Sequence, residues 1–494
     1  MEYTLTKDTI IKDTDEGIII YNTRTTDNVE LSGIAIEVFN TLLKEGDLKA
    51  IEKLLQIPTL NELTSRVTLN SLLYPLINLK LLSPKNTRVI KDKKINITTA
   101  AIETTNKCNF RCPHCYVDKA DYKILTYNEI IDLIDELYDL GASSILFTGG
   151  EVLTHKHFKE FYLYAYKKGF IITINTNGSL LDDSLIEFLK MTPPISLEIS
   201  LYGHNQRTYE DFTKTKISFD KFVETLQKIK ESSINLLCKS VITNSNKEYY
   251  KDMENICKEL EIPFKKDYIA FPSLDKSHDF NPEQISASEV IEFLRNDKIA
   301  QREYLKIFSN SDDSERKFVF ECRENNDGIF ISSEGKINVC PCMQSVSYQY
   351  KKGNLLECIL KLQELKNIEF REDSKCKNCK YISLCRYCPA KFYLTTGDYQ
   401  TPPSWFCEFG ELMYKNYIEG IRFIKEPISD DELIKIGNND FNKYKNINET
   451  IKIYVDGKLV SFAILEENNE YTILNNEVLT NDIESELKKY LNQL

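Results

Sequence analysis

A strand, loop and helix pattern repeated between residues 97 and 271 is the feature that most limits how this chain can fold. Short apolar runs alternate with longer segments whose apolar residues have helical spacing. The six runs lie at residues 97–104, 144–147, 170–175, 195–201, 235–242 and 265–271. Because strands that alternate with helices form a parallel sheet, the pattern predicts the α/β class and a partial (β/α)6 barrel of the TIM type. The chemistry of such a barrel lies at the carboxyl ends of its strands.

Two helices of this pattern can be placed from their ends. Thr126 and Glu129 form a capping box before an apolar stripe, so a helix is expected to begin there. A second helix is expected over residues 155–168. Its start is rich in lysine, and we therefore expect His155 and His157 to be solvated rather than to bind metal.

Residues 1–90 follow a different pattern and are expected to form a separate domain. Alternating runs at residues 17–21 and 29–31 predict a small antiparallel sheet. A small sheet beside three helices is a winged-helix-like outline. The charged stretch at residues 84–94 lacks apolar periodicity and is predicted to be a linker. The three helical segments are expected at residues 34–43, 48–55 and 69–82.

The C-terminal part, beyond a barrel domain at residues 95–310, changes character again. Residues 311–425 are predicted to be rich in loops and cysteine, with metal sites replacing a missing apolar core. Residues 426–494 form a last segment of unknown role. Its Asp-Gly pair at 456–457 predicts the type I′ turn of a hairpin, and a helix is expected at residues 482–491.

Charge and composition exclude two classes of partner. The chain has 63 Lys and Arg against 75 Asp and Glu and contains no basic block that would follow a phosphate backbone, so nucleic acid is not expected. There is no secretion signal pattern and no run near the roughly 18 apolar residues of a membrane helix, which predicts a cytoplasmic protein without a membrane partner. In that reducing compartment the 14 cysteines are expected to be metal ligands or catalytic thiols rather than disulfides.

The motif Cys108-Asn-Phe-Arg-Cys112-Pro-His-Cys115 follows the first predicted strand directly. Three thiolates on one short loop can bind three irons of a 4Fe-4S cluster and leave the fourth iron open to another ligand. Three buried free cysteines or a zinc site are the alternatives.

The motif Thr148-Gly149-Gly150-Glu151 ends the second predicted strand. Its glycines let the backbone approach a ligand and offer amide and carbonyl groups, and its carboxylate is suited to an ammonium group. An ordinary loop without a ligand is the alternative. Polar residues also end the next two strands, and the candidates there are Asn175, Asn177, Glu198 and Ser200.

A second set of cysteines lies in the C-terminal part. Without Cys342, its seven soft ligands are one short of the eight that two 4Fe-4S clusters need, so one position is vacant or filled by another ligand, and Cys342 is nearby. Zinc bound by the two Cys-x-x-Cys pairs is the alternative, although the five-residue gap between the pairs is short for a zinc ribbon. Cys238 and Cys257 are expected to be buried hydrophobic residues, and Cys358 has no assigned role. The set consists of Cys322, Cys340, Cys342, Cys376, Cys379, Cys385, Cys388 and Cys407.

Residues 97–275, with the first cysteine motif followed by the Gly-Gly-Glu loop, resemble the radical S-adenosylmethionine (radical SAM) superfamily. The resemblance implies a catalytic 4Fe-4S cluster on Cys108, Cys112 and Cys115, whose open iron chelates the methionine part of S-adenosylmethionine. It implies reductive cleavage of that cofactor to a 5′-deoxyadenosyl radical. The remaining cofactor contacts that it implies are Gly149, Gly150 and Glu151 at the methionine amino group, His114 near the adenine, and Asn177 and Ser200 at the ribose and carboxylate.

The later cysteines resemble the SPASM domain, which holds the auxiliary clusters of peptide-modifying radical enzymes. The resemblance implies an inner 4Fe-4S cluster on Cys322, Cys340 and Cys388, and so three clusters in all. One departure is that only Arg386 and Tyr387 separate the last two clustered cysteines, where the family usually has three residues. The outer cluster would be bound by Cys376, Cys379, Cys385 and Cys407.

The N-terminal part resembles the PqqD-like element that recognises precursor peptides, which implies that a leader peptide binds there as an added strand. A generic stabilising or dimerising domain is the alternative. Together the resemblances imply modification of a ribosomally made peptide, most commonly by a thioether or carbon–carbon cross-link, with flavodoxin or ferredoxin as the electron donor. Epimerisation, formylglycine-type oxidation of a protein Ser or Cys, and a non-catalytic iron-sulfur or zinc protein are the other hypotheses.

Overall fold

The fold was obtained as a computed structural model, which divides into two compact units. The first unit comprises residues 1–285, 317–374 and 388–401, and the second comprises residues 286–316, 375–387 and 402–494. The residues that the structure describes are 2–6, 9–14, 17–22, 28–57, 68–69, 72–73, 76, 81–85, 97–117, 121–232, 234–274, 282–297, 316–321, 328–343, 345–417, 421–425, 450–455, 458–465, 471–474 and 487.

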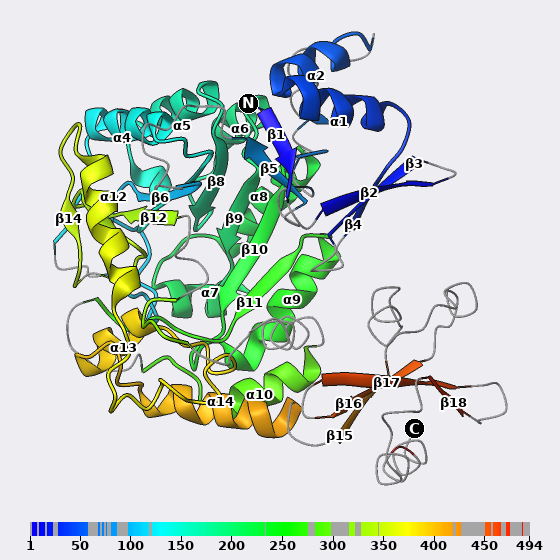
Figure 1. The fold of residues 1–494 in the computed structure, drawn as a ribbon. Helices are drawn as coiled ribbons and strands as arrows, with labels where there is room; N and C mark the ends of the chain where they lie inside the picture. The colour runs from blue at the N-terminus through cyan, green and yellow to red at the C-terminus, as the bar shows by residue number, and fades with distance from the viewer. Residues whose placement is uncertain are drawn as a thin grey trace. The chain divides into compact units, whose positions relative to one another are not determined.

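A sheet in the order β11-β10-β9-β8-β7-β6-β12-β13-β14 is the centre of the first unit (Figure 1). All pairings from β11 to β12 are parallel, so the predicted α/β class and partial TIM-type barrel are confirmed. The six predicted strands are β6 (Thr99–Glu103), β7 (Ser144–Thr148), β8 (Ile171–Thr176), β9 (Ser196–Ser200), β10 (Leu236–Val241) and β11 (Phe264–Asp267).

Alternation along each strand separates a helix-facing side from a barrel-facing side. Phe147 of β7 is fully buried and its ring lies 5.1 Å from that of Phe161 on α5. Leu146 and Thr148, one residue to either side, therefore project from the opposite face of the sheet. The helices of this layer are α4 (Tyr127–Asp139), α5 (Phe158–Lys167), α6 (Asp183–Met191), α8 (Phe219–Glu231) and α9 (Tyr250–Glu259), and α7 (Gln206–Thr213) lies between β9 and α8.

Both predicted helices form, with one correction. Thr126 and Glu129 make the expected capping box of α4. The second helix begins at Phe158 rather than at residue 155. His155 precedes it in a buried turn, where its Nε2 lies 2.8 Å from Leu125 O, so the expectation that His155 is solvated was wrong. A single lysine-rich stretch did not show that this imidazole would be covered by another segment.

The part expected to be rich in loops is more regular than predicted. β12 (Gly328–Ile331) extends the barrel sheet by pairing with β6, and the short strands β13 (Lys336–Asn338) and β14 (Tyr348–Gln349) follow it antiparallel. Helices α12 (Leu355–Gln363), α13 (Pro389–Thr396) and α14 (Ser404–Tyr417) were not predicted. The expected lack of an apolar core was also wrong, because Phe392, Phe406, Phe409, Leu355 and Ile359 are buried.

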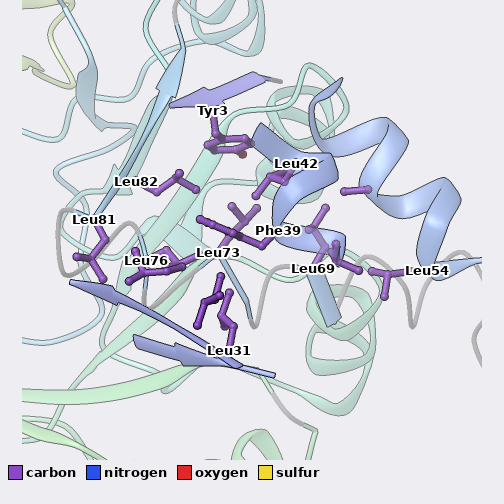
Figure 2. Close-up of a cluster of buried hydrophobic side chains, with 14 of the residues drawn as sticks. Tyr3, Leu31, Phe39, Leu42, Leu54, Leu69, Leu73, Leu76, Leu81 and Leu82 are labelled. Carbon is purple, nitrogen blue, oxygen red and sulfur yellow. The ribbon is translucent and has the colours of Figure 1, made fainter. Parts of the chain in front are cut away.

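The N-terminal part contains an antiparallel sheet of β2 (Thr9–Thr14), β3 (Gly17–Asn22) and β4 (Asn28–Leu31), as the alternating runs predict. Two of the three expected helices are α1 (Ile34–Glu45) and α2 (Asp47–Leu54). Most of the third lies outside the described residues. β1 (Glu2–Leu5) pairs with β5 (Leu82–Lys85), which takes the end of the third expected helix and the start of the expected linker. Figure 2 shows the buried cluster of this part, which includes Tyr3, Leu31, Phe39, Leu42, Leu54, Leu69, Leu73, Leu76, Leu81 and Leu82.

The second unit contains α10 (Ala287–Asn296), α14 and a separate sheet in the order β15-β16-β17-β18. Val455 of β16 pairs with Lys458 of β17, so the predicted hairpin is confirmed, and its two turn residues lie outside the described part. The helix expected at residues 482–491 also lies outside it, except for residue 487. No helix among the described residues is long and apolar enough to cross a membrane. The sheet consists of β15 (Ile421–Lys425), β16 (Thr450–Val455), β17 (Lys458–Leu465) and β18 (Tyr471–Leu474).

Candidate active site

The three cysteines of the first motif lie on one loop after β6. Cys108, Cys112 and Cys115 are all half-buried free thiols. The Phe110 amide donates to Cys108 Sγ at 3.3 Å, and the Cys115 amide donates to Cys112 O at 3.3 Å. Phe110 is buried and its ring meets that of Tyr209 edge-on, with centroids 5.9 Å apart. The three thiols therefore share one anchored loop.

Side-chain amides fix this loop to the end of β8. Asn177 donates from Nδ2 to Asn109 Oδ1 at 2.8 Å, and Asn109 donates from Nδ2 to Ser179 Oγ at 2.8 Å. The Asn177 amide also lies 3.9 Å from Cys108 Sγ. Burial raises the pKa of the Cys108 thiol, so a metal that binds it must displace its proton. Asn177, expected at the cofactor, thus lies beside the first cysteine.

The Gly149-Gly150 loop packs against the backbone that leads into the cysteine loop. The Gly150 amide donates to Thr105 O at 2.7 Å, and the Glu151 amide donates to Lys107 O at 2.8 Å. A Cβ at Gly149 would lie 2.4 Å from Thr105 O, and one at Gly150 would lie 2.6 Å from Lys107 O. The glycines are therefore required by a close approach of two backbone segments. The Gly150 amide is thereby hydrogen-bonded within the protein.

Glu151 is only 1% exposed, and three donors hold its carboxylate. Thr176 Oγ1 and the Asn177 amide donate to it at 2.6 Å each, and the Leu153 amide donates at 3.0 Å. Burial raises the pKa of Glu151, and these hydrogen bonds act in the opposite direction. A carboxylate has about four acceptor positions, so one remains. Among the described residues no Lys, Arg or His forms an ion pair with it, and the buried charge is suited to a cationic ligand.

An aromatic group surrounds His114. Its Nε2 lies 3.0 Å from the Tyr202 hydroxyl. The rings of Tyr202 and Phe212 stack with centroids 4.7 Å apart, and the His114 ring lies 4.8 Å from the first and 5.3 Å from the second. Burial, and then the neighbouring Cys112, raise the pKa of Tyr202, which keeps its hydroxyl neutral. These flat rings next to the cysteine loop are suited to contact with a planar base.

Polar side chains line the barrel-facing side of β8, β9 and β10. A Cβ at Gly178 would meet Ile199 of β9 and Phe222 of α8 together, so Ile199 faces the helices and its neighbours Glu198 and Ser200 face the barrel. Glu198 Oε2 forms an ion pair with Lys239 Nζ at 2.9 Å. Burial lowers the pKa of Lys239, and Glu198 opposes that change.

Asn175 belongs to the same side. It pairs in register with Glu198 across β8 and β9, while Ser200 pairs with Lys239 across β9 and β10. Its Oδ1 is buried and has no hydrogen-bond partner among the described residues. Asn175, Glu198 and Ser200 were found from their positions at strand ends. Lys239 was not, because its partner is 41 residues away in sequence.

Glu103, the last residue of β6, is a buried acid at this end of the sheet to which no sequence motif pointed. It is 8% exposed, and its Oε2 accepts from the Ser333 amide at 2.9 Å and from Ser333 Oγ at 2.8 Å. Burial raises the pKa of Glu103. Ser333 lies 230 residues later in the chain, so no local pattern indicated this contact.

The pKa of Tyr116 responds to cysteines of both sets, Cys115 of the first motif and Cys340 and Cys342 of the later one. Burial, then Glu103, Cys342, Cys115 and Cys340, raise its pKa well above the usual value. Thiols of the first motif and of the later set therefore both act on this one hydroxyl. Cys342 is buried and Cys340 is half-buried.

The four cysteines expected at the outer cluster come together in the second unit. Burial, then Cys407 and Cys379, raise the pKa of Cys376 to about 12, and Arg316 opposes the rise. Burial, followed by Cys376, Cys379 and Cys407, also raises the pKa of Cys385. Cys407 is exposed, and the other three are buried or half-buried.

The departure in cysteine spacing coincides with an unusual backbone conformation. Arg386 has a φ of 57°, in the left-handed region that costs a residue with a side chain roughly 1–2 kcal/mol. Cys385, just before it, belongs to the second unit, and Cys388 belongs to the first unit at the start of α13. The two-residue spacing is thus the point at which the chain passes from one unit to the other.

The remaining residues of interest take other roles or lie outside the described part. Cys322 lies outside it. Cys238 and Cys257 are fully buried, as expected, and Cys358 is buried on α12. His157 lies 3.3 Å from Glu160. No three His, Cys, Asp or Glu side chains among the described residues converge as ligands of a single metal ion; a 4Fe-4S cluster instead takes one thiolate on each iron.

The central part of the chain is similar to known proteins. Residues 102–260 match the sequence model of the Radical SAM superfamily. The AdoMet-dependent heme synthase of Methanosarcina barkeri is 23% identical over 60% of this chain and 93% of its own length. The antilisterial bacteriocin subtilosin biosynthesis protein AlbA of Bacillus subtilis is 30% identical over 27% of this chain and 31% of its own length.

A solved structure shares the fold over most of the chain. Streptococcus suis SuiB, crystallised with precursor peptide SuiA, superposes with a TM-score of 0.52 at 15% identity. The match covers 82% of this chain and 99% of that one.

Proposed function

We propose that this chain, which contains a radical SAM domain and is an enzyme of that superfamily, modifies a ribosomally synthesised peptide. We propose further that the modification is a cross-link, either a thioether from a cysteine sulfur to carbon or a carbon–carbon bond. The observation that carries the proposal is the placement of three half-buried thiols on one loop beside a buried carboxylate that has no cationic partner among the described residues.

The residues at this site fit the groups that the superfamily uses. Cys108, Cys112 and Cys115 would hold the catalytic 4Fe-4S cluster. When bound, the reduced cluster supplies the electron that cleaves S-adenosylmethionine to a 5′-deoxyadenosyl radical. Glu151 would accept the methionine ammonium at its remaining acceptor position, since three protein donors already fix the direction of its carboxylate.

The barrel-facing residues would hold the rest of the cofactor. Asn175 Oδ1 is a buried acceptor whose desolvation is uncompensated by any described residue, so a ribose hydroxyl is a suitable partner. Ser200 and Asn177 would bind polar groups of the ribose and carboxylate. His114, with the stacked rings of Tyr202 and Phe212, would lie along the adenine.

Two auxiliary 4Fe-4S clusters complete the proposal. The inner one would use Cys322, Cys340 and Cys388, with Cys342 as the extra ligand, because Cys342 and Cys340 both lie near Tyr116. The outer one would use Cys376, Cys379, Cys385 and Cys407. In this group the neighbouring thiols raise the pKa of Cys376 and of Cys385. With the catalytic cluster this gives three.

The peptide substrate is supported by the relatives. AlbA is named for the biosynthesis of a bacteriocin, and SuiB was crystallised with a precursor peptide. In this chain β2 is an edge strand on which Ile10 and Ile11 are 41% and 39% exposed. An unpaired edge with exposed apolar side chains can accept an added strand, so we place the leader peptide there. The domain boundaries at residues 90, 310 and 425 are part of the same proposal.

The similarity to AdoMet-dependent heme synthase favours a second candidate, modification of a porphyrin. It covers 93% of that protein but only 60% of this chain, so it leaves much of this chain without a role. The fold shared with SuiB extends over 82% of this chain, and we therefore place the peptide first.

The test uses protein reconstituted anaerobically with iron and sulfide, reduced with dithionite and given S-adenosylmethionine. Formation of 5′-deoxyadenosine that disappears in Cys108/Cys112/Cys115→Ala supports the active site, and its absence from the wild type would refute the enzyme assignment. A precursor peptide and an iron porphyrin are then supplied separately. A mass loss of about two hydrogens in the peptide supports cross-linking, whereas a change confined to the porphyrin would select the second candidate.

A further inference from the structure

Lys391, in the first turn of α13, is a buried cation without a counter-ion. It is only 8% exposed, and among the described residues it forms no ion pair. Moving an ammonium group out of water is costly unless an opposite charge accompanies it. The position of Lys391 therefore suits a protein in which a negatively charged group is bound nearby.

Aromatic side chains hold the ammonium inside the first unit. Lys391 Nζ lies 4.1 Å from the centroid of the Phe271 ring, which belongs to the loop after β11. The Phe271 ring in turn lies 5.2 Å from the ring of Tyr116, the residue that follows Cys115. A ring face attracts a cation but does not neutralise its charge. The charge of Lys391 thus remains to be compensated.

The start of α13 presents further donors at the same place. Cys388 is the N-cap, and its side chain makes no capping hydrogen bond. Pro389 has no amide hydrogen, and the Ala390 and Lys391 amides have no acceptor among the described residues. Amides of a first turn have no partner within their own helix and are usually capped or exposed to water. Ala390 is 3% exposed, so these donors are covered without being capped.

Helix geometry brings the donors together around Cys388. Residues three apart lie on the same side of a helix, and each Cα–Cβ bond leans toward the amino-terminal end. The Lys391 side chain is therefore directed along the face that carries Cys388, and the two uncapped amides point to the same end of α13. The helix dipole adds partial positive charge there. All of these groups favour a negative charge at the Cys388 sulfur.

We propose that Lys391 and the first turn of α13 stabilise the reduced form of the inner 4Fe-4S cluster and so raise its reduction potential. The inference rests on the proposed function, because it assumes that Cys388 is a ligand of that cluster. Reduction adds one electron to the cluster, which becomes more negative while no bond breaks. A nearby cation and N–H groups directed at sulfur favour the more negative form. Lys391 thus acts through the cluster rather than on the substrate.

The first measurement is the reduction potential of the inner cluster in the full-length, cluster-loaded protein. An anaerobic titration with dithionite as the electron donor is followed by electron paramagnetic resonance. The signal missing from Cys340/Cys342/Cys388→Ala is assigned to the inner cluster. Lys391→Met keeps a long apolar side chain without the charge, and we expect one-electron reduction to become at least about ten-fold less favourable, a fall of about 59 mV. Lys391→Arg keeps the charge and should stay within about three-fold of the wild type.

Lys258→Met is the matched control, since it removes one positive charge from an exposed position on α9. Its equilibrium constant for reduction of the inner cluster should stay within about two-fold of the wild type, because water screens an exposed charge. An equal shift in Lys258→Met and Lys391→Met would show an effect of net charge alone. That outcome, or no shift in Lys391→Met, would overturn the proposal.

Unfolding of the iron-free protein separates this role from a purely structural one. Without the cluster, the buried charge of Lys391 stabilises nothing, so Lys391→Met should raise the unfolding midpoint. A lower midpoint would mean that Lys391 stabilises the fold itself, and the proposal would be wrong. Loss of about four irons from Lys391→Met together with a higher iron-free midpoint would support it, because the charge would then be needed only by the cluster.

Iron content distinguishes failure of this inference from failure of the cluster assignment. If Cys340/Cys342/Cys388→Ala keeps all the iron of the wild type, these cysteines hold no cluster, and the assignment and the inference fail together. If that variant loses about four irons while Lys391→Met keeps the wild-type potential, the inference alone fails and the proposed function stands.

Discussion

Gly150 has no room for a side chain, because the Asn106 and Lys107 carbonyls would lie 2.4 Å and 2.6 Å from a Cβ. Both contacts are backbone atoms at the entrance to the cysteine loop and cannot move alone. We therefore expect Gly150→Ala to displace that loop. The variant should lose about four irons and at least about 100-fold in the rate of 5′-deoxyadenosine formation, measured by iron analysis and liquid chromatography.

Gly169→Ala is the control for general loss of stability. Gly169 has a φ of 85° and nothing within 4 Å of a Cβ, so alanine there is strained without touching the site. We expect a cost of about 1 kcal/mol and full iron content. If Gly150→Ala behaved like this control, the close approach would have no role in holding the cysteine loop.

Glu103 should make stability depend on pH. Burial raises its pKa in the folded state, so between the unfolded and folded pKa values the folded protein holds a proton that the unfolded chain has lost. Stability therefore falls as pH rises through this interval, by up to about 1.4 kcal/mol per pH unit for one such group. Glu103→Gln keeps an acceptor for Ser333 and removes the titration. In iron-free protein, its unfolding midpoint relative to the wild type should rise between about pH 4 and pH 8.

Glu357→Gln is the matched comparison for Glu103. This glutamate is exposed, and Lys361 lowers its pKa, so its ionisation affects stability only below its ordinary pKa. Glu357→Gln should therefore give almost no pH-dependent change in the midpoint over most of this range. A midpoint difference for Glu103→Gln that stays constant over the same pH range would show that the carboxyl is ionised throughout.

At the scale of elements, α14 depends on a glycine where it packs on the outer cysteine loop. A Cβ at Gly410 would lie 2.7 Å from the Cys385 Cβ and 3.1 Å from the Tyr381 Cβ. Alanine normally stabilises a helix interior by about 0.5–1 kcal/mol relative to glycine. Here we expect the clash to dominate, so Gly410→Ala should lower the unfolding midpoint and remove about four irons.

Glu408→Ala, an exposed change on the same helix, should keep both iron content and midpoint. A higher midpoint with full iron in Gly410→Ala would mean that the loop and helix separate easily. Electron paramagnetic resonance of the reduced protein shows which cluster signal is lost in Gly410→Ala.

The elements also show what the sequence could predict. The barrel strands were found because most of them are short, largely apolar runs between helices with a clear apolar stripe. The last strand, β11, has the sequence Phe-Lys-Lys-Asp and was found from the apolar residues that follow it. β12 to β14 were missed because they are only 4, 3 and 2 residues long and lie between cysteines. Helices α12 to α14 were missed because dense cysteines were taken to replace an apolar core, yet Phe406 and Phe409 are fully buried there.

Some residues of the candidate site could be predicted from the sequence and others could not. Cysteines, glycines and strand-end polar residues could be found because each motif is local in sequence. Glu103, Lys239 and Arg316 could not, since their contacts join strands or loops far apart in the chain. Burial of His155 was missed for the same reason, because the covering residue Leu125 belongs to another segment.

At the scale of the whole molecule, the cysteine sets are distributed over two compact units. The first cysteine motif, Cys340, Cys342 and Cys388 belong to the first unit, and Cys376, Cys379, Cys385 and Cys407 belong to the second. The second unit has its own buried side chains on α10 and α14, including Leu294 and Met413. An outer cluster held within one such unit should therefore assemble without the catalytic one.

We expect Cys376/Cys379/Cys385/Cys407→Ala to keep about eight of about twelve irons and to retain the change in the catalytic cluster's paramagnetic spectrum on addition of S-adenosylmethionine. Cys108/Cys112/Cys115→Ala should also keep about eight irons but lose that spectral change. Both variants would then differ only in which cluster is absent. If removing the outer four instead abolished the response to S-adenosylmethionine, the units would not assemble independently, and the outer cysteines would have to support the fold of the barrel as well as bind a cluster.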